Sequence, residues 1–146
     1  MNRSQRLQPV KKIAENREKE AANELGKAQK RLDEMLSRLK ELKQYREEYT
    51  RNFMTVGAQG MGVARMLEYR AFLAKIDGAV DYQTQVVEQV RRDCDYRQRV
   101  WGHLHGRVLA LDKVATRYRH QEDLDADRRL QKETDERAQR RRTAES

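Results

Sequence analysis

Residues 25–42 read LGKAQKRLDEMLSRLKEL, and the spacing within this stretch indicates the fold. Steps of three, four, three, four and three separate Leu25, Ala28, Leu32, Met35, Leu39 and Leu42. That spacing is the a/d repeat of a left-handed coiled coil. An apolar stripe of the same kind reaches back to Leu7 and forward to Val56. The pattern therefore predicts a first long helix over residues 1–56.

The composition agrees with long helices. Charged residues make up 38% of the 146 residues, aromatic residues only 6%, and Pro9 is the single proline. Ordinary globular domains are about one-quarter charged and nearly half apolar, so this chain is too poor in apolar residues for a multi-layer core. The fold class that we predict is all-α.

The first helix is predicted to end at Gly57-Ala-Gln-Gly-Met-Gly62. Glycine is the poorest helix former after proline, so three glycines in six residues mark a bend. A phosphate-binding loop would need a following Lys-Ser/Thr pair and a preceding buried strand, and both are missing. We interpret residues 57–62 as the Gly-rich tip of a hairpin.

A second apolar stripe runs from Met66 to Tyr118. Two successive steps of four around Val90 indicate a stutter, which locally unwinds a supercoil without breaking the helix. Leu73, Val80 and Val87 form a further row that steps by seven beside this stripe. Either the row contacts a third helix or a binding partner, or it widens the seam. The stripe itself contains Met66, Tyr69, Phe72, Ile76, Ala79, Gln83, Val86, Val90, Cys94, Arg97, Trp101, Leu104, Val108, Leu111, Ala115 and Tyr118.

Folding back at the glycines predicts two long helices that form an antiparallel coiled-coil hairpin. Phe53 then meets Met66, Leu25 meets Cys94, and Leu7 meets the turn that follows Val108. Residues 63–118 are the paired part of the second helix, because the apolar stripe and the pairing both end near Tyr118. Residues 119–146 form an unpaired charged C-terminal extension, either a fraying helix or a disordered segment.

Several functional classes are disfavoured. A two-helix structure encloses no substrate pocket, so we expect no enzyme, no catalytic residues and no cofactor. His103 and His105 lie about 200° apart around a helix, so we expect no metal site. The net charge of +8 is spread among interleaved acids rather than clustered, so nucleic-acid binding is not expected. The unpaired Cys94 and the lack of an apolar leader or span favour a soluble, intracellular chain.

The order of parts resembles the FliJ family of the flagellar type III export apparatus. The resemblance rests on Tyr45-Arg-Glu-Glu-Tyr49, the Gly-rich tip, Tyr69-Arg-Ala-Phe72 with Ile76 and Ala79, Trp101 and the charged C-terminal tail. It implies a non-enzymatic stalk whose paired termini bind and stimulate the ring of the export ATPase FliI. It also implies contact with the export-gate protein FlhA through Phe72, Ile76, Ala79 and Gln83, although family members can carry His at the last position.

The resemblance further implies escort of export chaperones and a cytoplasmic location, peripherally associated with the inner-membrane export apparatus. We expect a monomer without direct membrane insertion. Two alternatives stay open: the stalk of a related virulence-type secretion system, and a generic coiled-coil scaffold. A scaffold would bury the row of Leu73, Val80 and Val87 by self-association, whereas a swapped dimer would open the bend at Gly57–Gly62.

Overall fold

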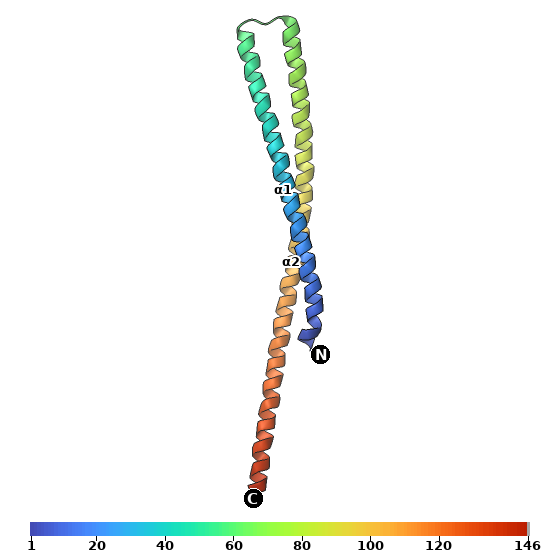
Figure 1. Ribbon diagram of the computed structural model, residues 1–146, viewed down its shortest axis with the longest axis vertical. Coiled ribbons are helices and arrows are strands. Elements are labelled where there is room, and N and C mark those ends of the chain that lie inside the picture. The colour runs from blue at the N-terminus through green and yellow to red at the C-terminus, as the bar shows by residue number, and fades with distance from the viewer. Residues whose placement is uncertain (146) are drawn as a thin grey trace. The chain divides into compact units, whose positions relative to one another are not determined.

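The computed structural model describes residues 1–145, and these residues form two helices without strands. Helix α1 spans Arg3–Ala58 and helix α2 spans Val63–Glu145. Figure 1 shows them joined by a short loop. The all-α hairpin predicted from the sequence is confirmed. Ser146, the last residue of the predicted extension, lies outside the described residues.

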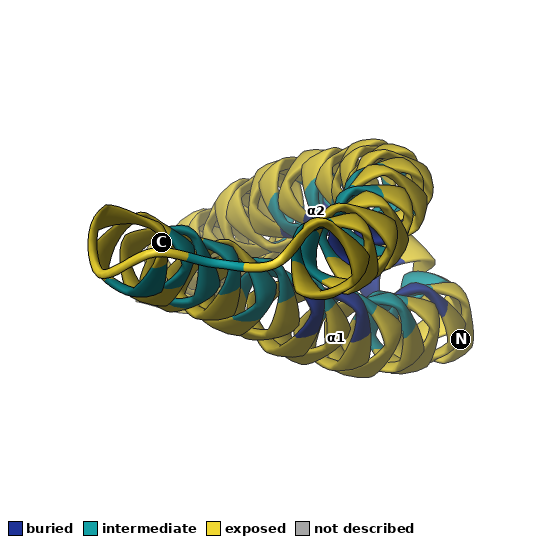
Figure 2. Ribbon diagram, turned by 90° about the horizontal axis from the view of Figure 1, so that it is seen from above, coloured by how far each residue is buried: buried dark blue, intermediate teal, exposed yellow. Residues whose placement is uncertain are grey.

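The chain divides into two compact units, and each helix contributes to both. The tip unit contains Ala21–Trp101, and the terminal unit combines Met1–Glu20 with the chain from Gly102 onward. Figure 2 shows buried and half-buried residues along the helix sides that form the seams, while the outer sides are exposed. In each unit the core is thus a single seam between α1 and α2.

The seam of α1 follows the three-four repeat from Ser4 to Val56 without a break. The repeat is longer than its apolar residues alone indicate, because some seam positions are polar. Val10, part of the apolar stripe, is 44% exposed, and the neighbouring Lys11 takes the seam position. The buried and half-buried residues of this repeat are Ser4, Leu7, Lys11, Ala14, Glu18, Ala21, Leu25, Ala28, Leu32, Met35, Leu39, Leu42, Arg46, Tyr49, Phe53 and Val56.

The seam of α2 contains no stutter, so the stutter predicted around Val90 is wrong. Val87 is buried, with 5% of its surface exposed, and Leu73 and Val80 are half-buried. These three residues continue the three-four repeat of α2, so they form the seam itself rather than a second row beside it. The stutter arose from reading Phe72, Ala79 and Val86 as seam residues. The buried and half-buried repeat is Met66, Tyr69, Leu73, Ile76, Val80, Gln83, Val87, Val90, Cys94, Arg97, Trp101, Leu104, Val108, Leu111, Ala115, Tyr118, Glu122 and Asp125.

The best-packed part of the tip unit surrounds three buried residues, Met35, Val87 and Val90. Partly buried leucines and a valine pack against them: Leu32, Leu36, Leu39 and Val86. Fully burying an aliphatic side chain of this size contributes about 1.5–3 kcal/mol. The cluster therefore supplies much of the apolar stabilisation that a two-helix seam can provide.

The observed register lies close to the predicted one. Phe53 packs on Tyr69 with ring centroids 5.2 Å apart, one turn from the predicted partner Met66. Glu24, beside Leu25, pairs with Arg97 at 3.5 Å. In the terminal unit Lys11 reaches Asp112 at 2.8 Å, and Ser4 contacts Glu122, one turn beyond Tyr118. Side chains on a helix reach about one turn along the axis, which accounts for these offsets.

Local signals set the ends of the helices. Gly60, between α1 and α2, has φ = +92°, a left-handed conformation that glycine adopts without strain. At the start of α1 the Asn2 side chain accepts the Gln5 N–H at 3.0 Å, and the Gln5 side chain accepts the Asn2 N–H at 3.3 Å. This reciprocal pair is a capping box, with Asn and Gln as its members.

Beyond Asp125 helix α2 continues to Glu145 with every residue exposed. The seam positions there are polar, so the burial of apolar side chains does not hold this segment. Arg142 lies in the last turn, where a positive charge interacts favourably with the helix dipole. The structure has a helix through Glu145.

The corrected seam can be tested with Val87→Ala and its neighbour Val86→Ala. Val87→Ala removes two buried methyl groups, so we expect it to lower the free energy of unfolding by about 1–2 kcal/mol. Val86 is half-buried and packs against the cluster from the flank, so Val86→Ala should lower the free energy of unfolding by less than Val87→Ala does. Urea denaturation followed by circular dichroism measures both. Equal losses would contradict the unbroken repeat.

Candidate functional site

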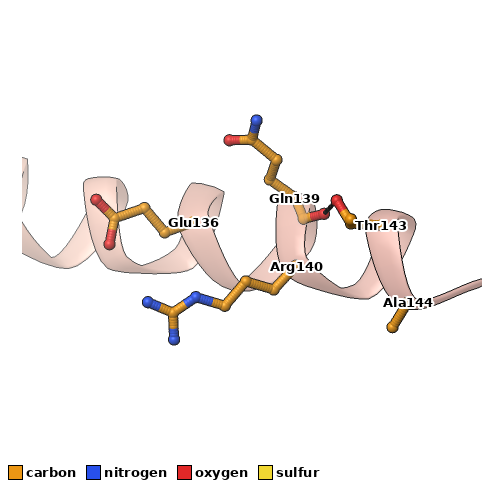
Figure 3. Close-up of a pocket in the computed structure, with 5 residues that line it drawn as sticks. All are labelled: Glu136, Gln139, Arg140, Thr143 and Ala144. Carbon is orange, nitrogen blue, oxygen red and sulfur yellow. Dashed lines mark hydrogen bonds between the residues drawn. The ribbon is translucent and has the colours of Figure 1, made fainter.

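Several hollows lie on the surface of the described part of the chain. Figure 3 shows one of them near the end of α2, and its lining comes from that helix alone. The drawn side chains point away from the axis in different directions, and the Thr143 hydroxyl donates to the Gln139 carbonyl oxygen at 2.9 Å. A substrate site needs a concave pocket that excludes water. The spaces between side chains of a single exposed helix do not meet that requirement.

No group of three or more His, Cys, Asp or Glu side chains within residues 1–145 is arranged to hold a metal ion. His103 is exposed, whereas His105 reaches across the terminal unit to Glu18, with Nδ1 2.6 Å from Oε1. The two histidines therefore lie in different surroundings. His105 links the two helices as a polar cross-seam contact.

Five aromatic residues gather in the tip unit, toward the loop. The Tyr49 ring lies at their centre, 5.0 Å from Tyr69 and 4.8 Å from Phe72 between centroids. Tyr45 meets Phe72 edge-on at 6.4 Å, and Phe53 packs on Tyr69. Tilted and edge-on pairs of this kind contribute about 0.5–1.5 kcal/mol each beyond their buried area. The cluster fixes how the two helices face each other at this end.

The electrostatics of the tip unit follow from this packing. Burial among the rings raises the pKa of Tyr49, and the neighbouring Tyr69 adds to the shift. One turn earlier, Arg46 occupies a seam position and donates to Asp77 across the seam. The hydrogen bond to Asp77, and then its charge, raise the pKa of Arg46. Both shifts favour the forms present at neutral pH, a neutral phenol and a cationic guanidinium.

The four residues of the implied gate contact occupy two kinds of position. Phe72 is 38% exposed and Ala79 is half-buried, and both lie on the flank of α2 beside the seam. Ile76 and Gln83 are seam residues, 5% and 8% exposed. Phe72 and Ala79 can present side chains to a partner without opening the hairpin, whereas Ile76 and Gln83 cannot.

Gln83 has a defined role inside the seam. Its side-chain amide donates to the backbone carbonyl oxygen of Met35 on α1 at 3.0 Å and lies 3.6 Å from the Met35 sulfur. A buried amide costs free energy unless it is hydrogen-bonded, and this bond satisfies it. Gln83 therefore ties α2 to α1 next to the apolar cluster around Val87.

Polar pairs cross the seam of the terminal unit. The Ser4 hydroxyl donates to Glu122 at 2.7 Å, and the Ser4 N–H donates to the same carboxylate at 3.0 Å. Lys11 pairs with Asp112, Glu18 contacts His105, and the Arg3 guanidinium lies 5.8 Å from the ring centroid of Tyr118. Apart from Tyr118, these residues are absent from the apolar stripes of the sequence. The signal that could have found those on α1 is that Ser4, Lys11 and Glu18 follow one another at steps of seven.

These features define a class, the antiparallel coiled-coil hairpin with functional groups along its surface. Comparison with known proteins is more specific. The family model of the flagellar FliJ protein matches residues 3–145. The chain therefore belongs to the FliJ family and is a flagellar, export-related protein.

One relative is the flagellar FliJ protein of Salmonella typhi. It is 27% identical over 134 residues, which cover 92% of this chain and 91% of the relative. No solved structure matches. Among the described residues, neither helix contains a stretch long and apolar enough to cross a bilayer.

The raised pKa of Tyr49 predicts a loss of stability at alkaline pH. At a pH above about 10, the ordinary tyrosine pKa, the unfolded chain releases this proton while the folded chain still holds it. The free energy of unfolding should therefore fall as the pH rises through that range. Tyr49→Phe removes this component. Urea titrations at neutral pH and above pH 10 should show a smaller loss for Tyr49→Phe than for the unmodified chain, and equal losses would contradict the assignment.

Proposed function

We propose that this chain is a non-enzymatic coiled-coil stalk of the flagellar type III export apparatus. In this role it binds and stimulates the ring of the export ATPase FliI and links that ring to the export gate FlhA. The observation that carries the proposal is the match to the FliJ family over residues 3–145, in a chain that folds as a two-helix hairpin. Escort of export chaperones belongs to the same proposal.

The terminal unit is the part we assign to the ATPase ring. It carries both chain ends, and its seam is held by ion pairs and hydrogen bonds. Its outer surface has exposed charges of both signs, such as Lys12, Lys19 and Glu20. Contacts between exposed charges are screened by salt and individually weak. A surface of this kind suits contacts that must form and break repeatedly as the subunits of a ring change state.

The flank of the tip unit is the part we assign to the export gate. Phe72 contributes an exposed ring that the Tyr45 and Tyr49 rings hold in place, and Ala79 lies two turns further along the same flank. Ile76 and Gln83 support this flank from inside the seam. The proposed contact thus has two exposed members and two buried ones, with different roles.

The two alternatives are now less favoured. The scaffold hypothesis assumed that self-association buries the row of Leu73, Val80 and Val87. In the structure these residues already pack in the seam of the hairpin itself. The family match is to a flagellar protein, which favours flagellar export over a virulence-type system. We accordingly propose a monomer that binds no nucleic acid, is cytoplasmic and associates peripherally with the inner-membrane export apparatus.

ATP hydrolysis by purified FliI, measured with and without this chain, tests the ATPase contact. We expect stimulation, and we expect Lys12→Glu with Lys19→Glu to raise the concentration for half-maximal stimulation roughly fivefold through lost charge pairs. The matched control reverses two exposed lysines of the tip unit, Lys30 and Lys40, and should leave stimulation unchanged. Stimulation that is absent, or equally reduced in both variants, would contradict the assignment.

Binding to the cytoplasmic part of FlhA, measured by calorimetry, tests the gate contact. Phe72→Ala should weaken binding about tenfold, because aromatic anchors dominate interfaces. Tyr96→Ala removes another exposed ring of the same unit and serves as the control. Ile76→Ala should instead lower hairpin stability by about 2 kcal/mol or more. If Tyr96→Ala weakened binding as much as Phe72→Ala, the assignment would be wrong.

A further inference from the structure

Three large apolar side chains close to the loop have no partner role in the proposed function. Met54, at the end of α1, is 69% exposed, and Val63 and Leu67, in the first turns of α2, are 75% and 59% exposed. We call these three residues the tip patch. Val63 and Leu67 are four residues apart and therefore share one face of α2.

The seam positions place the third member on the same side. Met54 directly follows the seam residue Phe53, and Leu67 directly follows the seam residue Met66. In an antiparallel pair, residues one step after an a position lie on the same flank of both helices. Contiguous exposed apolar side chains on one flank mark an interaction site more often than isolated ones do. This flank is opposite to the one that carries Phe72 and Ala79.

The charges beside the tip patch are predominantly positive. Arg70 follows the seam residue Tyr69 and shares the flank of the patch, and Arg51 lies at its outer edge. Lys43 lies further away on the same flank, about three turns before Met54. Asp77 also lies on this flank but pairs with Arg46. Glu47 is the remaining acid near the patch, because Glu48 and Glu68 fall on the other flank.

The composition and the place of the site favour a lipid surface. The patch adjoins the loop that turns on Gly60, at the end of the hairpin where α1 and α2 are joined. Apolar side chains flanked by Lys and Arg are the pattern of segments that lie in the headgroup region of anionic bilayers. Recognition of an apolar helix face by a protein commonly uses a hydrophobic groove on the partner.

We propose that the tip patch docks this chain on an anionic lipid surface, with Met54, Val63 and Leu67 in the interface and Arg70, Lys43 and Arg51 at the headgroups. The contact is peripheral and involves no membrane span. It extends the proposed function and needs neither the ATPase nor the gate, so a test with pure lipid separates the two.

The experiment is flotation of the full-length chain with phosphatidylcholine vesicles that contain about one-third phosphatidylglycerol. Val63→Asn with Leu67→Asn should lower the partition coefficient about tenfold. Arg70→Gln should lower it about fivefold, and high salt should act in the same direction. The matched control is Ile13→Asn with Leu109→Asn, two apolar residues of similar exposure in the terminal unit, and it should bind like the unmodified chain.

Each other outcome overturns the proposal. Absence of binding to anionic vesicles would leave the patch as a site for a protein. Equal losses in the tip and control variants, or no loss in either, would assign binding to charge elsewhere, such as the arginines at positions 137–142. Equal binding to pure phosphatidylcholine would remove the role of Arg70. Circular dichroism confirms that each variant is folded.

Discussion

The three-four repeat of seam positions is the constraint on which the rest of this structure depends. Two helices alone have one interface, and only a strict heptad keeps that interface turned toward the partner over many turns. Here the repeat runs without interruption from Ser4 to Val56 and from Met66 to Asp125. The position of a residue relative to this seam decides whether it is packed, as in the aromatic cluster, or exposed, as on the flanks.

The chemistry of the seam differs between the two units. In the tip unit it consists mainly of an apolar cluster and tilted aromatic rings, whose exposure to water costs free energy. In the terminal unit polar and charged pairs share it with small residues such as Ala14 and Ala115. Polar pairs exchange more readily with water, so local opening should require less free energy there. This distribution supports the proposed roles of the two units: the tip unit anchors the chain, and the contacts of the terminal unit form and break repeatedly.

Function on a hairpin must use residues that the seam leaves available. Phe72 illustrates this: its ring packs against Tyr49 on one side and remains exposed on the other. Ile76, one turn away, is buried, and the side-chain amide of Gln83 donates its hydrogen bond to the Met35 carbonyl oxygen. Residues that are neighbours in one motif can therefore have different roles: one contacts a partner, and another stabilises the hairpin beneath it.

The helical class, the bend at the glycines and the approximate register could be predicted from the sequence, because heptad spacing and glycine propensity are local properties. The sequence also carried the resemblance to the FliJ family. The choice of the seam stripe of α2 required the packed structure, since Phe72 and Leu73, or Val86 and Val87, are equally apolar neighbours and burial alone separates them. The packed structure was likewise needed to place Lys11, Glu18 and Arg46 in the seam, because a charge is accepted there only when the facing helix supplies its partner.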